Sequence, residues 1–329
     1  MKNKIVVGAD IGGTNTAVGL LSESGEILRK LKFSTTAFDD AESFVAALCA
    51  EILVEIEKLS DNYELCAVGL GAPNGNFYSG MVEEAPNLKW KGNVNLSAMF
   101  SKALNVPAVI TNDANAAAIG EMLYGGAKGL KNFVVITLGT GLGSGIVVNG
   151  ELLYGHTGFA GEVGHTTAQL DGRPCTCGKR GCLEAYISAR GFRQTAMEML
   201  TANKTESVLS QIPMEKLGPK SIAKAANEGD QIAREVFEWS GKILGRQLAD
   251  TVAYLSPEKI FLYGGIAHAG ELLLEPTRNA MEENLLHIFK GHTGLEFSQL
   301  QGKSGGILGA AALAWKSFCA AEKSVSSEG

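Results

Sequence analysis

Apolar residues near the start of the chain fall into short runs that have the length and composition of β-strands. Residues 4–9 (KIVVGA) predict a buried strand, residues 16–21 (TAVGLL) predict its antiparallel partner, and residues 25–33 extend the same sheet. Over residues 43–59 the apolar positions recur at helical spacing, at 45, 48, 52, 56 and 59. The pattern therefore predicts a sheet that is followed by a helix.

The same order, strands first and helices afterwards, occurs a second time along the chain. The helical stretch at its centre is expected to break near Gly229 and Gly241. Glycine-rich hairpin turns at 10–15 and 139–145 look like one device used twice, so we predict two related α/β halves with mixed sheets and a ligand between them. The other predicted elements are strands at 65–71, 106–113, 133–139, 146–155 and 259–265 and helices at 115–125, 187–200, 220–255, 271–286 and 305–318.

Length, charge and glycine content narrow the function. The 329 residues predict about two domains, and the 41 glycines exceed the roughly 23 of average usage, so backbone is expected to approach other groups closely.

The net charge of −6 argues against a nucleic-acid partner. We find no apolar run of membrane-spanning length, and Asp10 interrupts the run that a secretory signal would need. A cytoplasmic protein is expected, in which clustered cysteines indicate metal binding or chemistry rather than disulfides.

Residues 10–16 (DIGGTNT) place an acidic residue and a glycine turn at the end of a predicted strand. Gly12 and Gly13 let backbone N–H groups approach a phosphate, Thr14 and Asn15 add donors, and Asp10 is suited to a hydrated Mg²⁺ ion. A plain hairpin turn is the alternative for this motif alone.

A second glycine-threonine turn, LGTGLGSG at 138–145, changes that balance, because two such turns at strand ends favour a shared nucleotide-phosphate site. Two other phosphate motifs are excluded. The GKS at 302–304 lacks the earlier glycine of a P-loop, since position 297 is Phe, and Ser144 breaks the GxGxxG pattern of a Rossmann fold.

Polar residues in two further segments suggest a substrate site. Asn112 and Asp113 lie between a predicted strand and a predicted helix, where Asp113 is either the helix N-cap or a carboxylate that orients an attacking hydroxyl. Glu162 and His165 stand among glycines, and Glu184 closes a cysteine-rich segment. Together these side chains suit a sugar with many hydroxyls, although each alone is more often a solvated loop residue.

The motifs of this chain, taken in order, resemble those of the ROK family of bacterial sugar kinases. The resemblance rests on DIGGTNT, GLGAP (69–73), NDANAAAIGE, LGTGLGSGIVVNG, GEVGH, CTCGKRGCLE and LYGG (262–265), and it covers nearly the whole chain. It implies the two-domain actin-like ATPase fold, with ribonuclease H-like halves and a cleft that closes on substrate. It also implies ATP-dependent phosphorylation of the 6-hydroxyl of glucose.

The resemblance implies a role for each matching position. Asp113 matches the catalytic base that faces the 6-hydroxyl, and Asn112, Glu162, His165 and Glu184 match ligands of the other sugar hydroxyls. The positions that match the sites for ATP and Mg²⁺ are Asp10, Gly12, Gly13, Thr14, Gly139, Thr140 and Gly141 at the phosphates and Gly264 and Gly265 beside the nucleoside.

Asn74 is one departure from the family pattern, which often has GxPG where this chain has Gly71, Ala72, Pro73 and Asn74. We expect the extra side chain to donate to a sugar hydroxyl or to narrow the pocket against N-acetyl groups.

His165, Cys175, Cys177 and Cys182 match the family's zinc ligands, in the spacing His-x9-Cys-x-Cys-x4-Cys. Four such ligands fit tetrahedral Zn²⁺ and leave no open position, which indicates a structural ion. A disulfide and a nucleic-acid-binding finger are the alternatives, and compartment and charge disfavour both. We expect the zinc to tie Glu162 and Glu184 into one rigid unit, with the second ring nitrogen of His165 free for a sugar hydroxyl.

Rival functions and the domain boundaries complete the expectations. A kinase for another hexose or N-acetylhexosamine (N-acetylglucosamine, N-acetylmannosamine, mannose or fructose) is the nearest rival, and a non-catalytic sugar-sensing regulator is a remote one. The first strand starts at residue 4, which leaves no room for the N-terminal DNA-binding domain of repressor relatives. We expect a homodimer or homotetramer, a smaller domain of residues 1–112 plus 305–329, and a larger domain of residues 113–304 with a zinc knuckle at 165–182.

Overall fold

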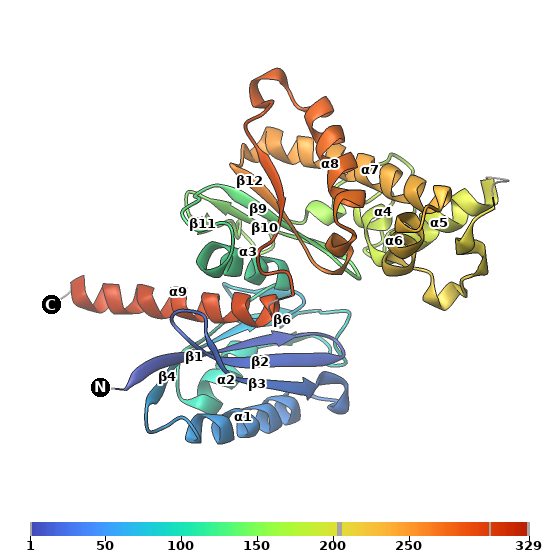
Figure 1. Cartoon of the computed structure of the whole chain (residues 1–329). Coiled ribbons are helices and arrows are strands. Elements are labelled where there is room, and N and C mark those ends of the chain that lie inside the picture. The colour runs from blue at the N-terminus through green and yellow to red at the C-terminus, as the bar shows by residue number, and fades with distance from the viewer. Residues whose placement is uncertain (1, 203–205, 303, 328–329) are drawn as a thin grey trace. The chain divides into compact units, whose positions relative to one another are not determined.

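A computed structural model describes residues 2–202, 206–302 and 304–327, which form two compact units (Figure 1). The first unit comprises Met1–Gly129, Leu152–Ala160 and Gln299–Gly329, and the second comprises Leu130–Glu151 and Gly161–Ser298. This division differs from the predicted boundary after residue 112. Helix α3 (Asp113–Tyr124) packs along α9 (Gly305–Ser327), so the chain stays in the first unit as far as Gly129.

The first unit is built on a five-stranded mixed sheet with the strand order β3-β2-β1-β4-β8. The predicted hairpin of β1 and β2 is confirmed as antiparallel, with Asp10 opposite Ala17, and β4 and β8 add in parallel on the other side of β1. The strands are β1 (Asn3–Ile11), β2 (Asn15–Ser22), β3 (Ile27–Ser34), β4 (Tyr63–Gly71) and β8 (Ala108–Thr111), with a separate small sheet of β5 (Gly75–Asn76), β6 (Met81–Glu83) and β7 (Asn93–Val94).

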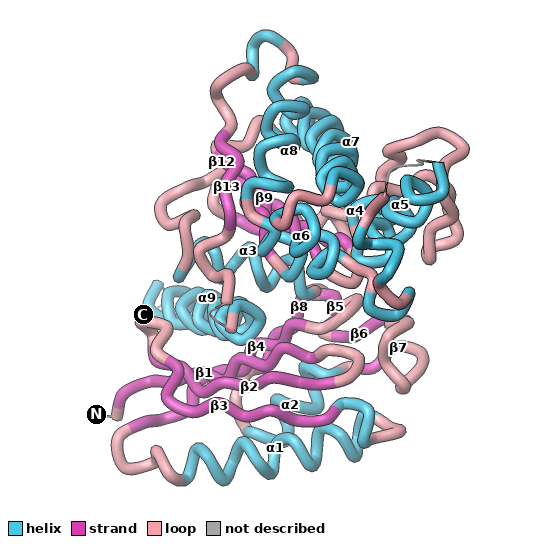
Figure 2. The backbone as a smooth tube through the Cα atoms, turned by 45° about the vertical axis from the view of Figure 1, so that its right-hand side comes forward, coloured by secondary structure: helices cyan, strands magenta, loops and turns pink. Residues whose placement is uncertain are grey.

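Helices cover both faces of this sheet (Figure 2). Helix α1 (Ala41–Glu57) starts after Asp40, whose carboxylate accepts the N–H of Ser43 at 2.7 Å, and it lies on one face with α2 (Leu96–Leu104), which the apolar pattern had not predicted. Successive side chains of a strand point to opposite faces, so apolar residues of β1 and β4 pack under α1 while Gly8 and Gly69 face α9. A methyl group at either glycine would collide with the α9 backbone.

The second unit repeats the strand order of the first, as β11-β10-β9-β12-β13. Again the first two strands, β9 and β10, are antiparallel and the last two, β12 and β13, are parallel to the first. The two related α/β halves and the fold class are thus confirmed. The elements are β9 (Phe133–Leu138), β10 (Leu142–Val148), β11 (Glu151–Leu152), β12 (Lys259–Tyr263), β13 (Gly294–Phe297), α4 (Glu184–Ile187), α5 (Ala189–Ala202), α6 (Pro219–Asn227), α7 (Gln231–Leu255) and α8 (Glu271–Asn284). Short 3-10 helices are η1 (Thr35–Ala37) in the first unit and η2 (Val163–His165), η3 (Val208–Gln211), η4 (Met214–Lys216), η5 (Gly265–Ala269) and η6 (His287–Phe289) in the second.

The structure corrects two local predictions in this unit. The expected break at Gly229 is present, but α7 runs unbroken through Gly241. Gly241 and Gly245 face α8, where a methyl group at Gly241 would lie 2.7 Å from Pro276, so these glycines allow close helix packing instead of ending the helix. Strand β10 begins at Leu142 rather than residue 146, because the turn after β9 is tighter than the glycine run suggested.

The described helices include none with both the length and the apolar character needed to cross a lipid bilayer.

Candidate active site

Strand register brings the acidic residues of the first unit to one edge of its sheet. Asp10 of β1 lies beside Gly71 of β4, and Gly71 lies beside Thr111 of β8. Because these strands are parallel, their carboxyl ends meet at one edge, where α/β sheets commonly bind ligands. Asp113 follows Thr111 by two residues and therefore starts α3 at the same edge.

Asn112, and not Asp113, is the N-cap of α3. The Oδ1 atom of Asn112 accepts the N–H of Asn115 at 2.7 Å, whereas Asp113 is the first helical residue and accepts only the N–H of Ala114, at 2.9 Å. The cap fixes the Asn112 amide, and it leaves most acceptor positions of the Asp113 carboxylate available. The alternative in which Asp113 serves merely as the cap is thereby excluded.

Loss of hydration raises the pKa of both carboxylates. Burial, and secondly the charge of Asp113, raise the pKa of Asp10 to about 6. The Asp113 side chain is exposed, but the protein around its carboxylate lowers hydration and raises the pKa of that group, an effect that the Ala114 N–H opposes. A pair of carboxylates at the C-terminal edge of a sheet is a donor set that fits a hard divalent cation such as Mg²⁺.

The DIGGTNT turn joins β1 to β2 beside these carboxylates. The Gly12 N–H donates to the Asn15 carbonyl at 3.0 Å, and Thr14 and Asn15 are exposed. Gly13 packs so closely on the Asn87 carbonyl that no side chain fits. The predicted phosphate-binding residues therefore form a tight turn with exposed donors, next to Asp10.

Asn74 has a structural explanation that the sequence did not suggest. Its backbone is left-handed, with φ of 51°, and its Nδ2 donates to the Glu83 carbonyl at 2.9 Å. Asn is one of the few residues that tolerate this conformation, which explains how it replaces the family's glycine. The amide nitrogen is engaged within the turn, so the predicted donation from Asn74 to a sugar would require this bond to be exchanged.

The second unit carries the other predicted nucleotide residues. Gly139, Thr140 and Gly141 form the β9–β10 turn, which the Gly139 N–H closes by donating to the Gly141 carbonyl at 2.9 Å. Gly264, with φ of 108°, follows β12 and packs against Leu138, the residue before the turn. The structure therefore places the 264–265 turn next to the 139–141 turn.

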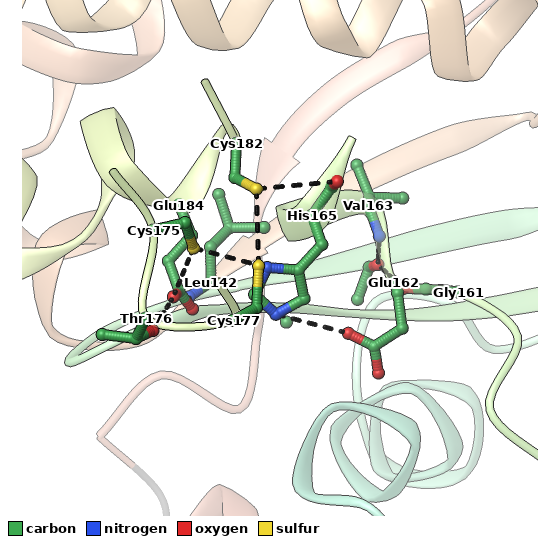
Figure 3. A network of polar contacts seen from close by, with 12 residues as sticks. Leu142, Gly161, Glu162, Val163, His165, Cys175, Thr176, Cys177, Cys182 and Glu184 are labelled. Carbon is green, nitrogen blue, oxygen red and sulfur yellow. Dashed lines mark hydrogen bonds and ion pairs between the residues drawn. The ribbon is translucent and has the colours of Figure 1, made fainter. Parts of the chain in front are cut away.

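His165, Cys175, Cys177 and Cys182 converge, as predicted (Figure 3). Their ligand atoms all lie within 4.8 Å of one another. The 3.7 Å between the Sγ atoms of Cys177 and Cys182 is far longer than a disulfide of roughly 2.05 Å, and it matches the roughly 3.8 Å between two sulfurs on a tetrahedral zinc ion. All six cysteines are free thiols, and the four-residue cluster fits a closed tetrahedral metal site.

The two ring nitrogens of His165 face different partners. Nδ1 lies 3.7 Å from the Cys175 Sγ, and Nε2 lies 3.9 Å from a carboxylate oxygen of Glu162. Glu184 is also beside the cluster, with one oxygen 3.8 Å from the Cys175 Sγ. The structure thus brings the three predicted sugar ligands of this unit to the borders of the cysteine cluster.

Three residues that support these ligands were not predicted. Ser144, buried in β10, donates to the Gly161 carbonyl, Thr176 donates to Glu184 at 3.3 Å, and Lys179 donates to the His165 carbonyl at 2.8 Å. The available signal was their position inside the motifs, since Thr176 and Lys179 lie between the cysteines. A cavity of about 450 Å³ that is bordered by α7 is lined by Glu162 but not by His165 or Glu184.

Nearly the whole chain is similar to known proteins. The ROK family profile matches residues 6–317. The glucokinase of Halalkalibacterium halodurans is 37% identical over 291 residues, 86% of each protein. The crystal structure of a ROK family glucokinase from Streptomyces griseus in complex with glucose and AMPPNP is 34% identical, with a TM-score of 0.78 over 95% of this chain and 99% of that one. The xylose repressor of Caldicellulosiruptor bescii is 30% identical over 84% of this chain and 70% of the repressor.

The raised pKa of Asp10 predicts that this residue costs stability at neutral pH. An acid whose pKa is higher in the folded state is protonated more readily there, so its penalty is absent below about pH 4 and complete above about pH 6. In Mg²⁺-free buffer at pH 8, the free energy of unfolding of Asp10→Asn should exceed that of the wild type by on the order of 1–3 kcal/mol, and the variant should unfold at a higher temperature. This difference should vanish as the pH falls toward about 4.

Thermal unfolding at a series of pH values measures this difference. Asp39→Asn, which removes a carboxylate that is 92% exposed, is the control and should show no such pH-dependent gain. If the difference in unfolding temperature between Asp10→Asn and the wild type did not change with pH, the raised pKa of Asp10 would be contradicted.

Proposed function

The chain belongs to the ROK family, and we propose that it is an ATP-dependent kinase that phosphorylates the 6-hydroxyl of glucose. The observation that carries the proposal is the placement of Asp113. The N-cap is the preceding residue, so the Asp113 carboxylate is not used in the cap. Asp113 starts α3 at the carboxyl ends of the parallel strands β1, β4 and β8, near Asp10. The similarity to a glucose- and AMPPNP-bound glucokinase supports the choice of substrates.

Asp113 aligns the 6-hydroxyl with the γ-phosphorus and accepts its proton. In phosphoryl transfer most of the catalysis comes from positioning and charge stabilisation, so the residue orients the nucleophile more than it activates it. The protein around Asp113 removes part of the hydration of its carboxylate and raises the pKa of that group, which makes the carboxylate a better proton acceptor.

The sugar's other hydroxyls are held by Asn112, Glu162, His165 and Glu184. The Asn112 amide nitrogen is a donor, because its oxygen is used in the helix cap. Carboxylates accept from hydroxyls, and the Nε2 atom of His165 points away from the cysteines, toward Glu162. A metal at Nδ1 would fix the tautomer in which Nε2 carries the proton and donates it to a sugar oxygen.

ATP binds through its phosphates at the glycine turns around 10–15 and 139–141, with its nucleoside beside Gly264 and Gly265. Backbone N–H groups in such turns bind phosphate oxygens. Asp10 binds Mg²⁺, which supplies positive charge against the phosphates. Support for this assignment comes from the exposed donors of the first turn and from the packing of Gly264 beside the second.

Zn²⁺ at His165, Cys175, Cys177 and Cys182 has a structural role in this proposal. A complete set of four protein ligands has no position for substrate or water, so the ion holds the neighbouring sugar ligands instead of reacting. We further propose a cytoplasmic location, where ATP is available and thiol ligands remain reduced, and a homodimer or homotetramer without nucleic-acid or membrane partners.

A sugar-sensing regulator is the second candidate, because the xylose repressor of Caldicellulosiruptor bescii is 30% identical. A regulator would bind sugar without consuming ATP. The paired acidic groups Asp10 and Asp113 favour the kinase, since sugar recognition alone does not need a second carboxylate whose pKa is raised by the first.

A panel of sugars tests the proposed reaction. With ATP and Mg²⁺, release of ADP should be fastest with glucose and slower with N-acetylglucosamine, N-acetylmannosamine, mannose and fructose. Omission of sugar measures the background ATP hydrolysis. A faster reaction with another sugar would reassign the substrate, and sugar binding without any ADP release would favour the regulator.

Asp113→Asn tests the catalytic base. The amide keeps the size of the side chain but accepts no proton, so kcat should fall roughly 100- to 10,000-fold while the glucose Kd changes little. Steady-state kinetics and calorimetry measure the two quantities. Asp39→Asn carries the same change in net charge at an exposed position and should retain full activity. A near-normal kcat in Asp113→Asn would reject the assignment.

Cys177→Ser tests the zinc site without disturbing the buried core, since Cys177 is exposed. The wild type should carry about one Zn²⁺ per chain, and the variant should lose most of it and show a raised glucose KM. Elemental analysis measures the metal. Cys319→Ser, at a cysteine outside the cluster, should keep the ion. A wild type without zinc after expression in zinc-supplemented medium would disprove the site.

A further inference from the structure

Glu184 contacts both the cysteine-rich segment and the β9–β10 turn. One carboxylate oxygen, Oε2, accepts the backbone N–H of Leu142 at 3.0 Å, and the other, Oε1, accepts the hydroxyl of Thr176 at 3.3 Å. Figure 3 shows these contacts converging on the single side chain. The carboxylate is therefore held from two directions by groups of its own unit.

Gly141 makes room for this arrangement. A methyl group at Gly141 would lie 2.5 Å from Oε2 of Glu184, well inside van der Waals contact. The φ angle of Gly141 is not in the left-handed region, so the backbone does not require glycine at this position. The only reason for glycine that the structure provides here is the close approach of the Glu184 carboxylate.

Gly139, two residues earlier in the same turn, is different. A methyl group there would meet no atom within 4 Å, and its φ angle is also ordinary. A small residue at this position leaves the backbone open to an incoming ligand, as a phosphate-binding glycine should. The two glycines of one motif thus face different surroundings.

We propose that Gly141 and Thr176 are positioning residues for the sugar ligand Glu184, and that Glu184 joins the sugar-binding segment to the nucleotide turn. The inference rests on the proposed function and revises one part of it, because the sequence assigned Gly141 to phosphate binding. A carboxylate offers about four acceptor positions, so acceptor capacity remains for a sugar hydroxyl beside the contacts with Leu142, Thr176 and the Cys175 Sγ. Their directions are set by the two protein bonds.

Gly141→Ala tests the proposal in a protein that should still fold. The atom that must move is the end of a flexible side chain, so the fold can adapt while the carboxylate leaves its place. Glucose affinity without nucleotide, measured by calorimetry, should weaken about 10- to 100-fold, as expected when a charge-assisted hydrogen bond is lost. AMPPNP affinity should change less than about threefold if the methyl acts only on Glu184.

Gly139→Ala is the matched control, with the same substitution in the same turn. Its glucose affinity should stay within about twofold of the wild type, because the added methyl meets nothing. Equal losses of glucose affinity in the two variants would overturn the proposal, since they would show a general effect of the turn. Normal glucose affinity in Gly141→Ala would overturn it as well.

Thr176→Val provides a second test that leaves the turn untouched. It replaces the hydroxyl by a methyl of similar shape, and glucose affinity should fall about 2- to 10-fold with zinc content unchanged. Thr176→Ser keeps the hydroxyl and should restore the affinity. Equal affinities for the Val and Ser variants would remove Thr176 from the proposal.

The wild type separates this inference from the proposed function. If the wild type neither binds nor phosphorylates glucose, the proposed function fails. If it does both and Gly141→Ala and Thr176→Val behave like it, only the role of Glu184 as a jointly held sugar ligand fails.

Discussion

The close approach of α9 to the sheet of the first unit is the constraint on which the acidic site depends. Gly8 and Gly69 carry no side chain on that face, so the alanine-rich helix lies directly on the strands. The start of the helix consequently comes so near to Asp10 that Gly306 could not carry a methyl group. Asp10 loses hydration in this packed environment, and with Asp113 nearby its pKa rises to about 6.

The second unit holds its functional groups by polar contacts rather than by backbone packing. Glu184 is fixed by an N–H group and a hydroxyl, and His165 is placed by cysteine sulfur on one side with Glu162 on the other. Glu162 and His165 lie in a glycine-rich segment that buries few apolar side chains, whereas Glu184 begins α4. A bound metal would supply the rigidity that such segments lack, which gives the cysteine cluster a physical purpose in a reaction that needs no zinc chemistry.

Much of the fold was predictable because it depends on local pattern. Short apolar runs located most strands and period-3.6 apolar patterns located most helices, and the repeated glycine hairpins indicated two related halves, which the common strand order confirms. The failures involve residues with two possible roles. Gly241 was expected to end a helix, and instead it lies inside α7 and allows α8 to pack closely. Helix α3 packs on α9, although a domain boundary was expected before α3.

The sequence by itself determined the family, the identity of the candidate ligands and the cysteine-histidine spacing, since these are properties of residue type and order. Only the tertiary structure decided what each residue contacts. It made Asn112 the helix cap, it gave Asn74 a left-handed turn that explains the departure from glycine, and it set Gly141 against Glu184. The physical reason is that residue order records neither backbone geometry, which decides between Asn112 and Asp113 as the cap, nor contacts between residues distant in the chain, such as Gly141 and Glu184.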